Sequence, residues 1–454
     1  MKNIILTIGF FVMSVLSQTV QADDRILDIQ SHTSPAGIEF WHVEDRTLPI
    51  LTMHFAFRGA GSLNDPDDMI GLGQLISNTM DEGAADRDSQ AFQKALEDHA
   101  IDLSFNSTRD HFTGKIKTIK RHADLAFELL RDAVQQPRFD EEAINRMRNA
   151  NISRIKSSQA RANWMASRLM NDAYYGDHPY ARNSGGTISG LEAVTAEAMR
   201  DFVKSKFGRN NLVLATAGDM SADEAAAIID QVFSKLPQNS DLKDISAVSP
   251  PAQPLQKAYK MDSPQSVVQM AWPAFAKTDD DYHALRVLNH ILGGGGFSSL
   301  LMDEVREQQG LTYGIYSHPV HMDYADYMVI ESATAPESVA PMVQSVQDIL
   351  TRLTQDNVTD QQLSEAKSYL IGSLPLRFSS TLSLSGAALR MQLDGREITA
   401  LDDFASHINA VTAEDVKRVA GRIFRNINPT VKIVTGAVPA NIDYDMVQSI
   451  PGIE

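Results

Sequence analysis

Residues 71–83 carry three polar side chains at the spacing of a catalytic metal helix. Gln74, Ser77 and Asn78 stand where a His-x-x-Glu-His motif would place two imidazoles and a carboxylate on one helical face. In such a motif the imidazoles bind zinc and the carboxylate activates the bound water. Here the three positions hold two amides and one hydroxyl, so the stretch has the spacing of a zinc helix without its ligands.

An apolar stripe in the same stretch predicts how the segment folds. Leu72, Leu75, Ile76 and Met80 fall at i, i+3, i+4 and i+8, which places them on one face of an α-helix. Asp81 extends the opposite, polar face. We therefore predict an amphipathic helix over residues 71–83. An ordinary amphipathic helix with no catalytic role would show the same pattern.

Length and charge limit the possible classes of protein. A chain of 454 residues is longer than one hydrophobic core normally supports, so two or more domains are expected. The formal net charge of −17 argues against a nucleic-acid partner, because phosphate binding requires a basic surface.

Residues 1–22 have the pattern of a secretory signal peptide. Lys2 precedes a short apolar run at 4–16, and the segment ends in small residues that suit cleavage near Ala22. No later run approaches the length of a membrane span, so no stable span is expected, and a retained N-terminal anchor is the alternative to cleavage. The chain has no cysteine, which excludes disulfides and a lipid-modified cysteine. We predict a periplasmic protein.

Hydrophobic periodicity predicts the elements that would position the polar residues. In the first half we expect strands at 37–42, 48–58, 103–119 (a pair) and 211–218, and helices at 89–100, 121–135, 140–174, 194–206 and 222–235. Prolines among polar residues mark 237–256 as an extended linker. The second half restarts with a strand at 266–272 and a helix at 279–292, whose run of aspartates suits N-capping.

A repeated motif indicates that the two halves are related. Val-Thr-Ala-Glu occurs at 194–197 and again at 411–414, and a strand ending in glycine follows each copy. The match of motif, following strand and position predicts a duplicated α+β domain. The expected divisions are 23–236 for the first domain, 237–256 for the linker and 257–454 for the second domain.

The order and spacing of short motifs give the chain a family resemblance. These are Arg-Gly-Ala-Gly-Ser at 58–62, Gly-Leu at 71–72, Asp-Glu-Gly-Ala at 81–84, His-Pro-Tyr at 178–180, Gly-Gly-Thr at 185–187, and the segments 292–296, 299–301, 305–307 and 310–313. With them the chain resembles the M16 (pitrilysin-like, inverted zinc motif) peptidases, in particular the two-domain bacterial branch. The resemblance implies two similar α+β domains, each an antiparallel-rich sheet covered by helices. It also implies a clam-like chamber in which a peptide adds as a strand to a sheet edge.

The same comparison shows what this chain lacks. The family motif would place His, Glu and His at positions 74, 77 and 78, and a third ligand, a glutamate, near residues 153–155. No glutamate occurs between Glu142 and Glu192. Amides are weak zinc ligands and a serine cannot replace the glutamate as general base. We therefore expect no metal, no cofactor and no catalytic residue at this site, and a noncatalytic subunit.

Two side chains of the second half match residues that the family uses for substrate. The resemblance assigns substrate binding to Arg306, near the end of a helix, and to Tyr313, expected on the next strand. Gly293, Gly294, Gly295 and Gly296 resemble the glycine-rich loop of noncatalytic M16 subunits, which is implicated in substrate admission. A helix C-cap that runs into a turn is the simpler explanation for one or two of these glycines.

The remaining histidines favour structural roles. His318 and His321 are spaced by three residues on an expected strand or loop, which separates their side chains and disfavours a metal pair. His178 is expected to fix a loop, and His54, which alternates within a strand, to pack.

The sequence therefore predicts the noncatalytic, substrate-binding subunit of a heterodimeric periplasmic zinc metallopeptidase that hydrolyses peptides. Its partner, an M16 subunit with an intact His-x-x-Glu-His helix, would carry the zinc. Two alternatives stay open: a stand-alone peptide-binding or chaperone-like pseudopeptidase, and a self-sufficient peptidase with an unfamiliar metal site.

Overall fold

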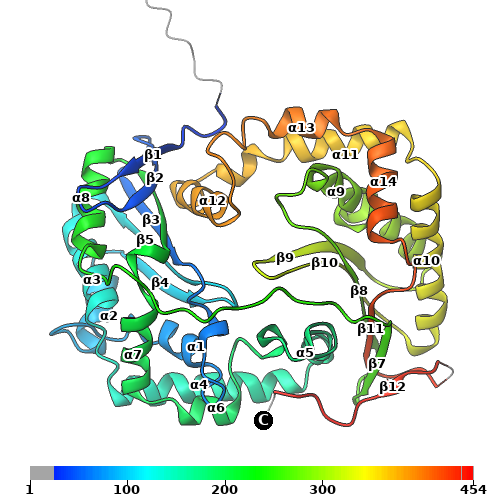
Figure 1. Cartoon of the computed structure of the whole chain (residues 1–454), viewed down its shortest axis with the longest axis horizontal. Helices are drawn as coiled ribbons and strands as arrows, with labels where there is room; N and C mark the ends of the chain where they lie inside the picture. Colours follow the sequence, from blue (N-terminus) through cyan, green and yellow to red (C-terminus); the bar gives the residue numbers. More distant parts are fainter. Residues whose placement is uncertain (1–24, 441, 453–454) are drawn as a thin grey trace, which may run out of the picture.

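The computed structural model describes residues 25–440 and 442–452 and contains two six-stranded sheets that face each other (Figure 1). The predicted signal peptide at 1–22 lies outside the described residues. No helix in the described ranges is long and apolar enough to cross a membrane.

The first half builds its sheet in the order β1-β2-β6-β3-β5-β4. Its strands are β1 (Gln30–Thr33), β2 (Glu39–Glu44), β3 (Ile50–Phe57), β4 (Asp102–Ser107), β5 (Phe112–Ile119) and β6 (Leu212–Gly218). Its helices are α1 (Leu72–Ser77), α2 (Ser89–Asp98), α3 (Ala123–Gln135), α4 (Glu141–Gln159), α5 (Ala162–Tyr175), α6 (Ile188–Ala193), α7 (Ala196–Lys206) and α8 (Ala222–Phe233).

The second half has the sheet order β12-β7-β11-β8-β10-β9. Its strands are β7 (Leu255–Lys260), β8 (Ser266–Pro273), β9 (Ile315–Met322), β10 (Ala325–Thr334), β11 (Val431–Gly436) and β12 (Asp445–Met446). Its helices are α9 (Tyr282–Asn289), α10 (Val339–Gln355), α11 (Asp360–Gly372), α12 (Thr381–Leu393), α13 (Phe404–Ala410) and α14 (Ala413–Ile423).

The two sheets share one topology, which confirms the duplicated α+β fold. Five strands of each sheet correspond: a parallel pair, β2 with β6 and β7 with β11, is followed by three strands that pair antiparallel. The outermost strands differ, since β1 pairs antiparallel with β2 and β12 pairs parallel with β7. The repeated Val-Thr-Ala-Glu motif starts equivalent helices. Thr195 caps α7 by accepting from the Ala198 N–H at 3.1 Å, and Thr412 caps α14 by accepting from the Asp415 N–H at 3.1 Å.

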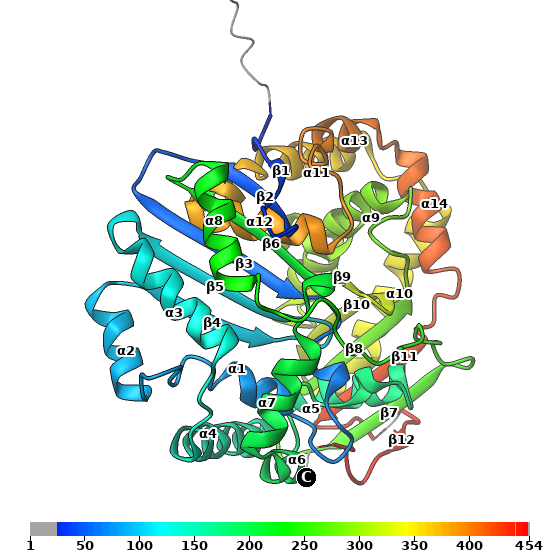
Figure 2. The same ribbon diagram turned by 60° about the vertical axis from the view of Figure 1, so that its left-hand side comes forward.

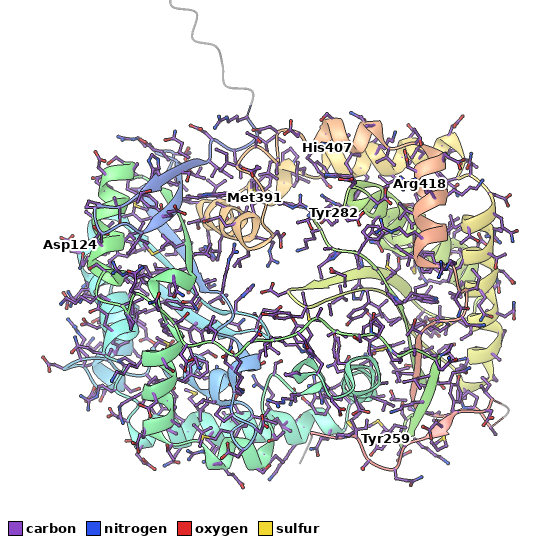
Figure 3. All side chains as sticks on the ribbon, in the orientation of Figure 1. Asp124, Tyr259, Tyr282, Met391, His407 and Arg418 are labelled. Carbon is purple, nitrogen blue, oxygen red and sulfur yellow. The ribbon has the colours of Figure 1, made fainter. Side chains whose placement is uncertain are left out.

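Each half places one helix on the sheet of the other half. Helix α5 packs on β11, β8 and β7 of the second sheet, and α12 packs on β3 and β6 of the first (Figures 1 and 2). Buried side chains fill both contacts: Leu169 lies in a cluster with Ile433, and Met391 of α12, labelled in Figure 3, lies in a cluster with Ala215. The cores of the two halves are therefore joined by reciprocal helix packing.

Threonine hydroxyls fix the start of each exchanged helix. The Thr435 hydroxyl on β11 donates to the carbonyl of Ala162, the first residue of α5, at 2.8 Å. The Thr52 hydroxyl on β3 donates to the carbonyl of Thr381, the first residue of α12, at 3.1 Å. The register of each helix on the opposite sheet is thus set by a buried hydrogen bond.

The connection between the halves has neither helix nor strand over 237–254 and passes between them (Figure 1). Side chains and backbone fix it at several points. Lys243 N–H donates to Asn64 Oδ1 at 3.1 Å, and Val248 N–H donates to the carbonyl of Tyr324 at 2.8 Å. His178 contacts the carbonyl of Ser246 through Nε2 at 3.0 Å, so this histidine fixes the connection.

Two predicted helices differ in the structure. The helix predicted over 71–83 ends at Ser77, and the Thr79 hydroxyl bonds back to the Leu75 carbonyl at 2.8 Å where the chain turns. The helix predicted over 140–174 breaks at 160–161 into α4 and α5. In both places a local turn of the backbone interrupts a hydrophobic pattern that would suit a continuous helix.

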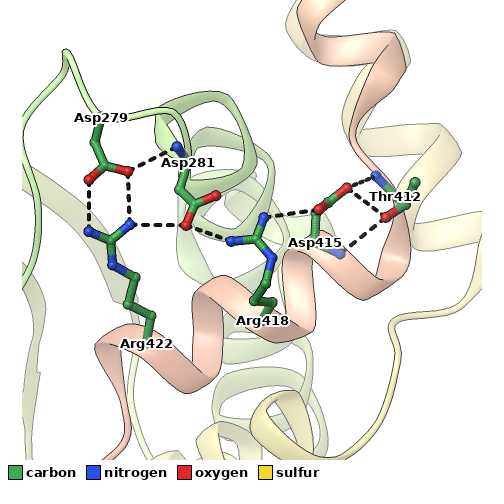
Figure 4. A network of polar contacts seen from close by, with 6 residues as sticks. All are labelled: Asp279, Asp281, Thr412, Asp415, Arg418 and Arg422. Atoms are coloured by element: carbon green, nitrogen blue, oxygen red, sulfur yellow. Dashed lines mark hydrogen bonds and ion pairs between the residues drawn. The ribbon is translucent and has the colours of Figure 1, made fainter.

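The aspartate run before α9 does not cap that helix. Asp281 makes no side-chain cap bond. Instead Arg418 of α14 donates to Asp281 at 2.6 Å, and Arg422 donates to Asp279 at 2.7 Å (Figure 4). The predicted N-cap is therefore absent at Asp281, but Asp279 Oδ1 accepts the Asp281 N–H at 2.9 Å in the turn before α9, and the two arginines tie α14 to this turn.

Candidate functional site

Helix α1 is held by a buried carboxylate and by its apolar stripe. Asp65 accepts the backbone N–H of Gly71 at 2.8 Å and that of Gly73 at 2.9 Å, which satisfies donors at the start of the helix. Burial raises the pKa of Asp65 to about 7. The predicted stripe is confirmed, because its four members are at most 2% exposed: Leu72, Leu75, Ile76 and Met80.

The polar face of α1 forms a closed network of neutral groups. Gln74 Nε2 donates to Asn78 Oδ1 at 3.1 Å and lies 3.3 Å from the Ser77 hydroxyl, which itself donates to the Gln74 carbonyl at 2.8 Å. Asn151 of α4 donates from Nδ2 to the same Asn78 oxygen at 3.0 Å. The three positions singled out in the sequence thus lie together and are bridged to α4.

Asn151 is the member of this network that the sequence did not reveal. The remote position was expected near residues 153–155, and Asn151 lies just before that segment. The signal was the helical stripe of α4, since Ile144, Asn151, Ile155 and Ser158 are all buried on one face. A buried asparagine within such a stripe requires a hydrogen-bond partner.

The donor set of this network does not fit a zinc ion. Zinc in proteins binds imidazole nitrogens, thiolates or carboxylates, and the network offers amides and a hydroxyl that already bond to one another. The two acids that follow, Asp81 and Glu82, lie beyond the end of the helix, and Glu82 pairs with Arg146 at 2.5 Å. Within the described ranges no group of three or more histidine, aspartate or glutamate side chains is arranged to hold a metal ion.

Arg306 lies in a π-helical segment, Leu301–Gln308, that contacts the edge strand β9. Its guanidinium carbon lies 4.6 Å from the centroid of the Phe297 ring, a cation–π contact, and its Nη1 lies 2.9 Å from the Glu307 carboxylate. Phe297 is itself 69% exposed. The Arg306 side chain is 28% exposed and its Nη1 atom is buried, so only part of the guanidinium is open to a ligand.

Tyr313 is 87% exposed and precedes β9, which begins at Ile315. Its predicted place on the strand is wrong because the chain makes a bend at this residue. The neighbouring Thr312 is buried and bonds the Ala333 carbonyl of β10 at 2.8 Å, so the loop is fixed while the Tyr313 phenol projects outward. No hydrogen bond joins Tyr313 to Arg306 in the described contacts.

The glycine run combines a close approach with a left-handed turn. Gly293 lies in the π-helical turn His290–Gly294, where an added Cβ would come within 2.5 Å of the Ser317 backbone nitrogen. Gly296 has φ +62° and no heavy atom within 4 Å of an added Cβ. Close packing against β9 therefore favours glycine at position 293, and the left-handed backbone favours glycine at position 296.

Replacing Gly293 with alanine should destabilise the protein more than the same change at Gly296. The Gly293 methyl would press on the backbone of β9 and cost about 1–3 kcal/mol. The Gly296 methyl meets open space and only the left-handed conformation opposes it, at about 1–2 kcal/mol. Urea unfolding of both variants tests this order, and Gly296→Asn should recover part of the loss, because asparagine tolerates that conformation. Equal or reversed losses would exclude the packing argument.

The histidines occupy structural positions. His54 Nδ1 lies 2.9 Å from the Ser385 hydroxyl, which joins β3 to α12. Desolvation, assisted by the charge of Lys115, lowers the pKa of His54 to about 4. His321 Nδ1 contacts Asp326 at 2.6 Å, whereas His318 lies on the exposed face of β9.

Acid should weaken the contact between β3 and α12 through His54. The pKa of His54 is about 4 in the folded protein and has its ordinary value of about 6.5 in the unfolded chain, so the unfolded chain binds the proton more readily. The contribution of neutral His54 to the free energy of unfolding is complete above pH 6.5. It is lost as the pH falls toward 4, and the total loss is roughly 3 kcal/mol. Urea midpoints measured across this range should fall less steeply for His54→Gln than for the natural protein. The exposed control His318→Gln should keep the natural slope, and identical slopes for all three would refute the assignment.

Comparisons with known proteins place this fold and site in a family. The model described as "Insulinase (Peptidase family M16)" matches residues 57–187, and the model described as "Peptidase M16 inactive domain" matches residues 193–370. The chain belongs to the M16 peptidase family.

Several proteins are similar to this chain over most of its length. The "Non-peptidase homolog YmxG" of Helicobacter pylori is 26% identical over 75% of this chain and 79% of its own length. The "Uncharacterized zinc protease YmxG" of Bacillus subtilis is 23% identical over 81% and 88%. The solved "peptidase M16 inactive domain" from Pseudomonas fluorescens has a TM-score of 0.84 and 27% identity, covering 92% of this chain and 100% of that one. These matches show the family and its fold, and the amide network occupies the position where the family motif would place its zinc ligands.

Proposed function

We propose that this chain is the substrate-binding, noncatalytic subunit of a heterodimeric periplasmic zinc metallopeptidase that hydrolyses peptides. The observation that carries the proposal is a contrast between the halves. The metal position of the first half holds four neutral side chains bonded to one another, whereas the second half has an exposed Tyr313 and a partly exposed Arg306 guanidinium.

In this proposal a partner M16 chain with an intact His-x-x-Glu-His helix supplies the zinc-bound water and the general base. The residues of the present chain bind and orient the peptide. The Arg306 guanidinium offers fixed donors to a peptide carbonyl or carboxylate, and the Phe297 ring keeps its plane in place. The Tyr313 hydroxyl can donate to a carbonyl oxygen on which negative charge develops.

Unpaired sheet edges support a peptide as the ligand. Strand β4 ends the first sheet beside α1, and β9 ends the second sheet beside the Arg306 segment. An extended peptide can add to such an edge through main-chain hydrogen bonds. The periplasmic location rests on the signal-peptide pattern at 1–22.

Co-expression tests the proposal. The chain, produced with an exported M16 protein that keeps His-x-x-Glu-His, should co-purify with it, and peptide cleavage should need both chains. Recovery of the chain alone from cells, with tight binding of extended peptides and no partner, would support the stand-alone pseudopeptidase instead. The printed description of the Helicobacter pylori relative as a non-peptidase homologue is compatible with that second function.

A further inference from the structure

The second half carries a group of basic side chains that has no role in the proposed peptidase. They come from α9, from α13, from the turn Pro375–Phe378 and from the segment that follows α12. Helices α9 and α13 lie side by side, and Tyr282 and His407, labelled in Figure 3, mark the place where they meet. We call this group the basic cluster: His283, Arg286, Arg377, Arg396 and His407.

Aromatic rings hold two of the guanidinium groups in place. The guanidinium carbon of Arg286 lies 4.4 Å from the centroid of the Phe404 ring on α13. That of Arg396 lies 4.6 Å from the centroid of the Tyr282 ring on α9. The His283 ring lies beside both of these rings, with centroid distances of 6.0 Å and 5.6 Å. Shared rings therefore connect α9, α13 and the segment that carries Arg396.

The positive charge of the cluster is not neutralised by the protein. Within the described ranges the side chains of Arg286, Arg377 and Arg396 form no ion pair and no hydrogen bond. Acidic residues outnumber lysine and arginine by 58 to 41 in the whole chain, so composition alone would favour an acidic partner for each. By contrast, Arg418 and Arg422 of the same half both pair with aspartates.

The members of the cluster are close enough to repel one another. Burial and the charges of the neighbouring cluster members lower the pKa of His283 to about 4. Burial also lowers the pKa of the Arg286 guanidinium, and the charges of Arg377 and Arg396 act in the same direction. Arg286 and Arg396 are half-buried, whereas Arg377 is exposed. An anion bound here would relieve this repulsion.

We propose that the basic cluster binds a phosphate group, held by the guanidinium groups of Arg286, Arg377 and Arg396. A phosphate monoester carries close to two negative charges and three strong acceptor oxygens. The planar guanidinium offers paired N–H donors that match such oxygens. A single carboxylate would neutralise only one of the three arginines, which come from three separate segments. The site needs neither a partner chain nor Tyr313, so it stands or falls independently of the proposed peptidase.

The phosphate group can belong to a soluble compound or to a phospholipid headgroup. The chain enters the second half beside this cluster, since the Ile26 N–H donates to Asp402 Oδ1 at 2.9 Å just before α13. An N-terminal apolar segment that is retained as an anchor would therefore bring the cluster close to a bilayer. The recognition chemistry is the same for both sources.

Calorimetric titration of the purified chain at low salt tests the proposal with pyrophosphate as the probe. Pyrophosphate should bind, and acetate at the same ionic strength should bind at least about tenfold more weakly, because one carboxylate forms fewer charge-assisted hydrogen bonds. Failure of pyrophosphate to bind, or equal binding of acetate, would overturn the proposal.

Variants assign the binding to the cluster. Arg377→Gln changes an exposed side chain, so folding should be unaffected, and it should weaken pyrophosphate binding at least about tenfold, as should Arg396→Gln. Arg286→Lys keeps the charge but loses the paired donors, so its loss should be smaller. Arg425→Gln replaces an exposed arginine outside the cluster and should change nothing. Unchanged binding in Arg377→Gln and Arg396→Gln, or an equal loss in Arg425→Gln, would contradict the assignment.

Co-sedimentation with phosphatidylglycerol vesicles distinguishes the two sources. Vesicle binding that pyrophosphate displaces and Arg377→Gln weakens would assign the site to a lipid headgroup. Pyrophosphate binding without vesicle binding would assign it to a soluble phosphate compound. Vesicle binding that neither pyrophosphate nor Arg377→Gln reduces would contradict a phosphate site at this cluster.

Discussion

Replacing Tyr313 with phenylalanine is expected to lower the kcat of peptide cleavage by the assembled peptidase about 100-fold. A hydroxyl that donates to a developing oxyanion contributes on the order of 10²–10³ in kcat. The change removes one oxygen atom from a side chain that is 87% exposed, so folding should be unaffected. Steady-state cleavage of a fluorogenic peptide by the co-purified complex measures the effect.

Tyr369 provides a matched control. It is also exposed, at 60%, and stacks on His290 with ring centroids 4.7 Å apart. Tyr369→Phe should leave kcat within about twofold of the natural complex. Arg306→Ala should lower kcat/KM by about 10–100-fold, the loss of a charged hydrogen bond. Natural rates for both Tyr313→Phe and Arg306→Ala would refute the substrate role of this surface.

Replacing Leu169 with alanine is expected to lower the free energy of unfolding by about 2–5 kcal/mol. Leu169 is fully buried on α5, where it packs among residues of the second sheet although it belongs to the first half of the chain. The loss should therefore destabilise the contact between halves and not one half alone. Urea unfolding followed by circular dichroism and by tryptophan fluorescence measures the stability and the number of transitions.

The exposed leucine Leu376 is the control for this change. It is 75% exposed in the second half, so Leu376→Ala should alter stability by no more than about 0.5 kcal/mol. The natural protein should unfold in one transition by both probes, because reciprocal helices join the two cores. Separate transitions, with Leu169→Ala affecting only the first, would contradict that arrangement.

The sequence predicted the helices and strands more accurately than the contacts between them. The apolar stripe of α1 and the repeated Val-Thr-Ala-Glu motif encode local periodicity and capping, and the structure confirms both. The exchange of α5 and α12 was not predictable, because Leu169 and Ile433 carry no local pattern that pairs them. Helix ends were also missed: Thr79 turns the chain after Ser77 through a bond to a backbone carbonyl that propensity does not register.

The sequence revealed which zinc ligands the candidate site lacks, but it did not reveal the hydrogen bonds that the residues of the site make. Glutamine, serine and asparagine at 74, 77 and 78 were sufficient to exclude the usual zinc donors. Their mutual hydrogen bonds, and the bond from Asn151, depend on the packing of α4 against α1, which no spacing rule fixes. The loop position of Tyr313 likewise depends on Thr312, which bonds to β10 across the sheet.

We propose that this chain lacks its own catalytic metal and acts through a partner. Metal content and peptide cleavage should be measured on the lone chain, on the partner alone, and on the two mixed, with and without a chelator. We expect the lone chain to contain no stoichiometric zinc and to show no chelator-sensitive cleavage. Full cleavage should require the mixture of the two chains. Stoichiometric zinc together with chelator-sensitive cleavage by the lone chain would contradict it.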